Sequence, residues 1–164
     1  MRGRRRRSLD EQPASQCEVL LASDGRKAFS PRAVAQAAAL ADSAPAAVVT
    51  IAKIHGTQFG FPHPGLLPTK QEIAERSKWV EDAIRELRRR GVEADGQVAA
   101  TRKARKKITA IARLRGVKVV VIDETESTGV RRMVEGDLGS ELRRSLRKDA
   151  IEVEVVPREP VGSD

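Results

Sequence analysis

The stretch of residues 117–156 constrains the fold most, because it reads as a strand, a loop, a short helix and a second strand. Residues 117–122 are apolar and β-branched apart from Lys118, a composition typical of a strand covered on both faces in a parallel sheet. The crossover between the two strands is supplied by a helix that is expected to open at Gly139-Ser140 and to end near Lys148. The stretch therefore predicts a parallel sheet with helices on its faces.

The alternation of strand and helix patterns continues through the rest of the chain. Further strands are expected at residues 18–23, 46–54 and 92–100. Ser30-Pro31 marks one helix start, and the capping box Thr69-x-x-Glu72 marks another. A third helix is expected from residue 101 to about residue 115, with a buried stripe made of Ala104, Ile108, Ile111 and Leu114. This order predicts an α/β fold with a doubly wound, five-stranded parallel sheet and right-handed crossovers.

The loop after residue 122 carries glycines at a spacing that suits phosphate binding. Gly129 is followed by nine residues and then by Gly139-Ser140 at the start of the helix. Glycine lets backbone N–H groups approach an anion, and a helix N-terminus adds unpaired donors and a favourable dipole. The alternative is that these glycines only turn the chain and cap the helix.

At these residues the sequence resembles the universal stress protein family. ATP-binding members carry G-x-x-G, nine residues, and then G-S or G-T, and this chain keeps Gly129, Gly139 and Ser140 in register. It departs from the pattern at the first glycine, where it has Glu126. The resemblance implies strand order 3-2-1-4-5, and it implies that Asp24, which follows the first strand, lies by the ribose and adenine of a bound nucleotide. Glu126 would place a carboxylate where phosphates approach.

One folded domain is expected at residues 17–157, between a disordered basic tail at residues 1–16 and a disordered C-terminal tail at residues 158–164. The 164 residues are enough for one core and too few for two. The arginine-rich start is not followed by an apolar signal-peptide core, and no segment is long and apolar enough to span a membrane. The single cysteine, Cys17, suggests a buried thiol in a reducing compartment. We therefore expect a cytoplasmic protein.

No motif for an activated nucleophile, a Walker lysine loop or a zinc protease is present, so we do not expect an enzyme. His55 and His63 lie in one loop without further ligands, and no metal site is expected. The leading hypothesis is a universal-stress-like regulatory domain that binds ATP or another adenine nucleotide through Asp24, Gly129, Gly139 and Ser140. The alternative is a nucleotide-free stress adaptor that acts through protein contacts.

The last strand bears on self-association. Residues 151–156 alternate apolar residues with Glu152 and Glu154, which is typical of an edge strand, and the resemblance implies a homodimer through this strand.

Two runs of positive charge bear on other partners. Residues 102–107 place five cations at a helix start, and the tail adds five arginines. Charge runs are mostly solvated faces, so nucleic acid binding is the third and weakest hypothesis and is not expected.

Overall fold

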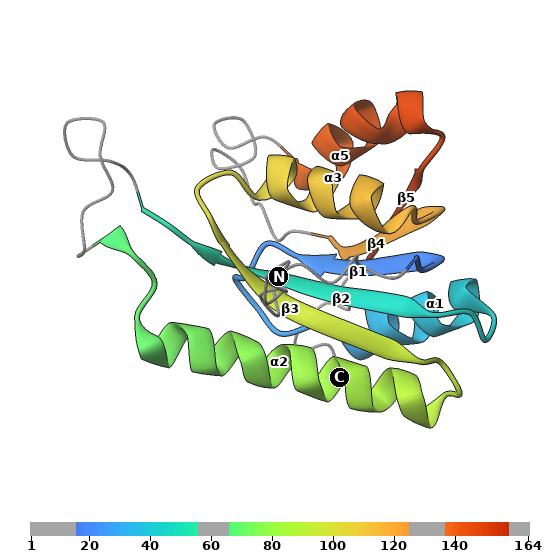
Figure 1. Ribbon diagram of the computed structural model, residues 1–164, viewed down its shortest axis with the longest axis horizontal. Coiled ribbons are helices and arrows are strands. Elements are labelled where there is room, and N and C mark those ends of the chain that lie inside the picture. Colours follow the sequence, from blue (N-terminus) through green and yellow to red (C-terminus); the bar gives the residue numbers. More distant parts are fainter. Residues whose placement is uncertain (1–15, 56–65, 125–136, 158–164) are drawn as a thin grey trace, which may run out of the picture.

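The computed structural model describes residues 16–55, 66–124 and 137–157 (Figure 1). The strands are β1 (Val19–Ser23), β2 (Ala46–Lys53), β3 (Ala94–Thr101), β4 (Val119–Asp123) and β5 (Glu152–Val156). The helices are α1 (Pro31–Ala41), α2 (Lys70–Arg89), α3 (Ala104–Arg115) and α5 (Leu138–Leu146), and the 3-10 turn η3 (Arg147–Asp149) follows α5. None of the helices in these ranges is long and apolar enough to cross a bilayer.

The five strands form one parallel sheet in the order β3-β2-β1-β4-β5. β1 lies in the centre, where Leu20 pairs with Ala47 of β2 on one side and with Val120 of β4 on the other. The predicted fold class and the strand order 3-2-1-4-5 are therefore confirmed.

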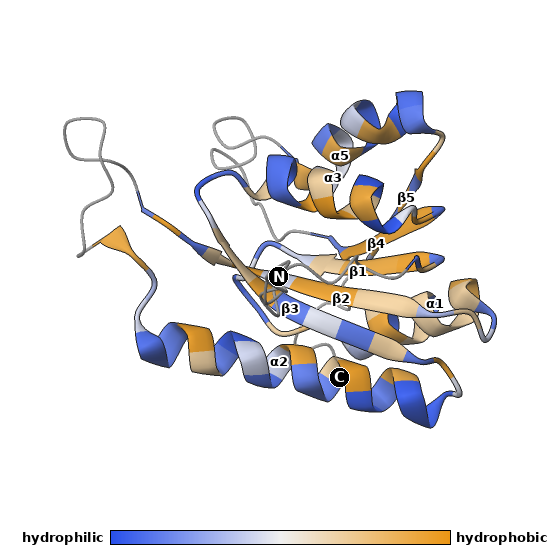
Figure 2. Ribbon diagram, viewed as in Figure 1, coloured by the Kyte–Doolittle hydropathy of each residue, from blue (hydrophilic) through white to orange (hydrophobic). Residues whose placement is uncertain are grey.

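The sheet is covered on both faces, as the apolar strands require. α1 and α2 cover one face, where Leu21, Val48 and Val121 are buried, and α3 and α5 cover the other, where Leu20, Val49 and Val120 are buried. Figure 2 shows the central strands almost wholly in the hydrophobic colour. Burial on both faces explains why these strands read as continuous apolar runs and not as alternating ones.

The helix starts follow the predicted caps. Ser30 accepts a hydrogen bond from Ala33 N at 3.1 Å, and Thr69 accepts one from Glu72 N at 3.1 Å. α3 begins at Ala104, where the N-cap residue Lys103 makes no side-chain cap. The predicted helix boundaries therefore hold to within a few residues.

The buried stripe predicted for the third helix is wrong at its last position. Leu114 is 70% exposed, whereas Ala112, which was not predicted, is fully buried with Ile108 and Ile111. α3 packs on both the sheet and α5. The buried side of the helix is therefore rotated away from the side that the spacing of apolar residues along one face predicts.

β3 and β5 are the two edges of the sheet, as the strand order implied by the resemblance requires, and for β5 the alternating pattern also predicts an edge. On β5 the side chain of Val153 is buried, whereas Glu152 and Glu154 are exposed. An apolar inner face and a charged outer face are thus combined on a strand at the edge of the sheet.

Cys17 lies just before β1, with only 5% of its surface exposed. Burial raises the pKa of its thiol, and the nearby Arg115 guanidinium offsets only part of this effect. The folded state therefore favours the protonated thiol. That contribution to stability is present below the ordinary thiol pKa and disappears as the pH rises through the higher folded value.

We expect Cys17 in the native protein to react with a thiol reagent at neutral pH far more slowly than in denaturant. The measurement is the rate of absorbance change with dithionitrobenzoate, and because the chain has one cysteine the signal belongs to it alone. Equal rates in the native and denatured protein would contradict the burial of this thiol.

Candidate functional site

The winding of the sheet reverses between β1 and β4. β1 is followed by α1 on one face, and β4 is followed further along the chain by α5 on the other. In open α/β sheets, ligands bind beyond the carboxyl ends of the strands at this switch point. The described residues at the ends of β1 and β4, together with the start of α5, therefore form the candidate site.

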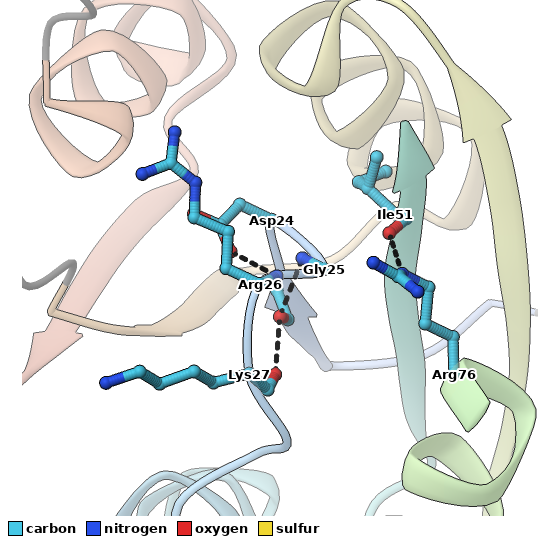
Figure 3. A network of polar contacts seen from close by, with 7 residues as sticks. Asp24, Gly25, Arg26, Lys27, Ile51 and Arg76 are labelled. Carbon is cyan, nitrogen blue, oxygen red and sulfur yellow. Dashed lines mark hydrogen bonds and ion pairs between the residues drawn. The ribbon is translucent and has the colours of Figure 1, made fainter. Parts of the chain in front are cut away.

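The turn after β1 is fixed by Gly25, which has a φ of +85°. A Cβ atom at this position would lie 1.7 Å from the carbonyl oxygen of Ile51 in β2, so no other residue fits. Gly25 N donates to Ser23 Oγ at 3.1 Å, and Ser23 Oγ donates to Lys27 O at 3.4 Å (Figure 3). The backbone thus turns sharply against the neighbouring strand.

Asp24 stands at the carboxyl end of β1, as predicted. Its Oδ1 accepts from Arg26 N at 3.0 Å, and its Oδ2 lies 3.6 Å from Arg26 Nε. Its side chain is 21% exposed, so the carboxylate remains accessible while it holds the turn. Figure 3 shows the side chains of Arg26 and Lys27 extending from this turn, and that of Arg26 lies beside the predicted ribose-side carboxylate.

Arg76 of α2 contacts the same Ile51 carbonyl that lies against Gly25. Its Nε donates to Ile51 O at 3.0 Å, and its Nη1 donates to Glu72 O at 3.3 Å, while the guanidinium lies over the Trp79 ring at 5.5 Å. The Ile51 carbonyl is therefore in contact with both Gly25 and Arg76. Sequence reasoning missed this residue, because 25 positions separate Arg76 from Ile51 and no local pattern links them.

Asp123 joins the end of β4 to the start of α1. Its carboxylate accepts hydrogen bonds from Ser30 N at 3.0 Å and from the Ser30 hydroxyl. The hydroxyl also accepts from Ala33 N, so the N-cap of α1 is tied to β4. Sequence reasoning missed this link across the switch point. A signal for it existed, since Asp123 ends a strand as Asp24 does.

The start of α5 differs from an open phosphate cradle. Asp137 caps the helix, and its Oδ1 accepts from Gly139 N at 3.1 Å while its Oδ2 accepts from the Ser140 hydroxyl at 3.0 Å. Two donors predicted to face a phosphate are thus bonded to a carboxylate of the chain itself. A phosphate can take them only by displacing Asp137.

Gly139 also has a packing role. A Cβ atom on it would lie 2.8 Å from Val155 Cγ2 of β5 and 3.4 Å from Ile122 Cδ1 of β4. The absence of a side chain therefore lets α5 approach the sheet closely. This supports the alternative interpretation of the glycine, in which it serves the fold.

The predicted site residues are placed only in part. Asp24, Gly139 and Ser140 all lie on loops or helix starts at the carboxyl edge, with Asp24 after β1 and the other two at the start of the helix that follows β4. The described contacts of Asp24 are with Arg26, and those of Gly139 and Ser140 are with Asp137. Gly129 and Glu126 lie outside the described residues. In the described ranges, no group of three potential metal ligands occurs.

The same fold occurs in solved universal stress protein structures. One from Burkholderia pseudomallei is 21% identical with a TM-score of 0.56, and the match covers 86% of this chain and 96% of that one. One from Archaeoglobus fulgidus in complex with dAMP is 19% identical with a TM-score of 0.55, covering 84% and 95%. One in complex with cAMP is 15% identical with a TM-score of 0.59, covering 87% and 98%. This chain has the universal stress protein fold.

No protein-family model matches the sequence, and no curated protein matches it. The relation to universal stress proteins is thus carried by three-dimensional structure. Within the universal stress protein fold, the switch point between β1 and β4 is occupied here by the Gly25 turn, the Asp123–Ser30 link and the acid-capped start of α5.

The packing role of Gly139 predicts the sign of a stability change. Gly139→Ala should destabilise the protein by up to about 2 kcal/mol, because overpacking against Val155 costs about 1 to 3 kcal/mol and the higher helix propensity of alanine returns about 1. In a Val155→Ala background the same substitution should be neutral or stabilising, since the contacting methyl is gone. Urea unfolding of the four proteins measures this coupling. If Gly139→Ala stabilises the otherwise unchanged chain, the packing role is wrong.

Proposed function

We propose that this protein is a non-catalytic regulatory domain that binds an adenine nucleotide at the switch point between β1 and β4. The observation that carries the proposal is the universal stress protein fold, which in two solved structures is in complex with dAMP and cAMP. Its stress-related role and its cytoplasmic location are part of the same proposal. The alternative is a nucleotide-free adaptor, favoured by the carboxylate that already occupies the start of α5.

The residues of this chain fit the sugar end of a nucleotide better than the phosphate end. Asp24 is accessible at the end of β1 and can accept hydrogen bonds from ribose hydroxyls. The start of α5 instead presents the carboxylates of Asp137 and Glu141. Glu141 is half-exposed and lies 4.0 Å from Arg105 Nε, so part of its charge is compensated, whereas Asp137 is bonded to neutral donors. Asp137 is therefore the main described obstacle to phosphate.

This obstacle implies a preference for ligands with few phosphates. Two like charges about 4 Å apart at a protein surface repel by roughly 1 to 4 kcal/mol, depending on the local dielectric, and ATP brings more negative charge than AMP. We therefore propose that AMP-like nucleotides bind more tightly than ATP. Ligand binding would act by displacing Asp137 and re-forming the cap of α5, which is a local change at the end of one helix.

The test is calorimetric titration of AMP, ADP and ATP into the wild type, Asp137→Asn and Asp42→Asn. Asparagine caps a helix about as well as aspartate, so Asp137→Asn removes charge while keeping the cap. It should tighten ATP binding by about tenfold for each 1.4 kcal/mol of repulsion relieved. Asp42 is exposed at the left-handed C-cap of α1, near the opposite edge of the sheet, and is the matched control with the same charge change.

Two further variants separate the outcomes. Ser140→Ala should weaken binding if the hydroxyl turns from Asp137 to the ligand, and Glu126→Gly restores the first glycine of the family pattern. Binding by Glu126→Gly alone would mean a degraded site and would favour the adaptor. If no variant and no nucleotide gives a binding signal, the nucleotide proposal is wrong.

We also propose that the protein forms a homodimer by pairing β5 with its symmetry mate. β5 lies at the edge of the sheet, and its outer face carries Glu152 and Glu154. Glutamates opposed across the new pair would repel, so the dimer should strengthen when this charge is removed. Light scattering of the wild type, Glu154→Gln and the edge-blocking Glu154→Pro at tens of micromolar tests this. A monomeric wild type and Glu154→Gln would contradict the dimer.

A further inference from the structure

The two helical layers carry very different charge. The layer made of α3, α5 and η3 with their caps, residues 102–116 and 137–149, contains eleven basic and three acidic residues. The layer made of α1 and α2 with their caps, residues 30–42 and 69–90, contains eight basic and six acidic residues. The first layer is thus as positive as the whole chain, which has a net charge of +8. Among the described helices, most of the cationic excess therefore lies on the side of α3 and α5.

α2 shows how a solvated helix face is built in this protein. Lys78 and Arg85 share Asp82 at 3.1 and 3.5 Å, and Arg89 and Arg90 share Glu86 at 3.5 and 3.2 Å. These pairs have the i,i+3 and i,i+4 spacings that place opposite charges side by side on a helix. Four basic residues on this face are therefore paired with acidic residues of their own helix.

The α3 and α5 layer uses its few acids differently. Arg105 contacts both Glu141 and Ser145 of α5, and Arg113 binds Asp149 of η3 at 2.8 Å, so these contacts fasten α3 to α5 and to η3. Within the described ranges, seven exposed cations of this layer have no ion pair or side-chain hydrogen bond: Arg102, Lys103, Lys106, Lys107, Arg144, Arg147 and Lys148. We name these seven residues the basic face.

The basic face has an energetic cost for the isolated protein. Four of its cations lie at the start of α3, where the helix dipole is already positive and no side chain caps the helix. Each such charge is repelled by the positive end of the helix dipole. The α2 face shows that exposed cations in this chain can be paired with acidic residues of the same helix. A partner of opposite charge would offset the cost.

The kinds of residue exposed on the α3 and α5 layer favour one class of anionic partner over the others. A membrane-binding face combines cations with large apolar groups, whereas Leu114 is the one large exposed hydrophobic residue described on this layer. α3 and α5 contain no aromatic residue, so base stacking, on which single-strand binding depends, is not available from them. Arginine and lysine without stacking groups suit the phosphate backbone of a duplex.

We propose that the basic face binds the backbone of double-stranded nucleic acid without sequence preference. From the sequence this function ranks last, because charge runs such as residues 102–107 and the tail are mostly solvated faces. Packing of α3 on α5 adds three cations to the same layer. The twelve residues of α3 extend about 18 Å, a span over which a duplex presents about ten phosphate charges. The proposal is independent of the nucleotide site.

The experiment is fluorescence anisotropy of labelled duplexes of two unrelated sequences with the full chain, between about 50 and 200 mM salt. One variant carries Lys103→Gln, Lys106→Gln and Lys107→Gln, and a second carries Arg144→Gln, Arg147→Gln and Lys148→Gln. Each should weaken binding equally for both sequences, and the slope of log K against log salt should become shallower by about one for each phosphate that is no longer neutralised. Neither should lower the thermal midpoint, because these side chains support no described contact.

The matched control carries Lys78→Gln, Arg85→Gln and Arg89→Gln on α2, with the same change in net charge. It should bind the duplexes nearly as the wild type does. A second control replaces the five arginines of residues 2–7, which measures the contribution of the tail. Equally weakened binding in the α2 control, or weakened binding in the tail variant alone, would overturn the proposal. A wild type that binds phosphatidylserine vesicles but no duplex would also overturn it, if the basic-face variants lose the vesicle binding.

Discussion

The pairing of β1 between β2 and β4 is the constraint on which the rest of the structure depends. Val19, Leu20 and Leu21 have no exposed surface, because each faces a helical layer while the backbone pairs on both sides. This central position requires the chain to cross from β3 to β4 and so places the switch point at the end of β1. The candidate site, the two helical layers and their unequal charge all follow from that one arrangement.

The fold was predictable from sequence to the extent that its signals are local. Ser30-Pro31 and Thr69 mark helix starts within a few residues, and apolar runs identify strands without knowledge of their neighbours. Strand order came from a resemblance, because no run of residues specifies its neighbour in a parallel sheet. Leu114 was misassigned for the same reason, since the buried arc of α3 depends on where α5 lies.

The candidate site was predictable in position but not in its contacts. Asp24 and Gly139 were expected at the carboxyl edge and lie there. The Asp123–Ser30 bond joins residues 93 positions apart, and Arg76 reaches Ile51 from another helix, so neither has a signature within one segment. A glycine motif is also ambiguous in principle. The sequence does not distinguish a glycine that leaves room for a phosphate from one that leaves room for a neighbouring methyl group. Only the packing in the structure shows that Gly139 leaves room for Val155.

α3 and α5 are neighbours in one layer, but the caps and charges at their N-termini are opposite in kind. α5 begins with the cap of Asp137 and with Glu141, which favour the helix dipole and repel phosphate, whereas α3 begins without a side-chain cap and with cations that oppose the dipole and attract phosphate. Arg105 lies between them and compensates Glu141. The start of α5 is therefore the better stabilised of these two helix starts, and the start of α3 attracts anions more strongly. A phosphate near this edge is drawn toward α3 first, so the proposed backbone binding needs no change in the fold, while the proposed nucleotide site needs Asp137 to move.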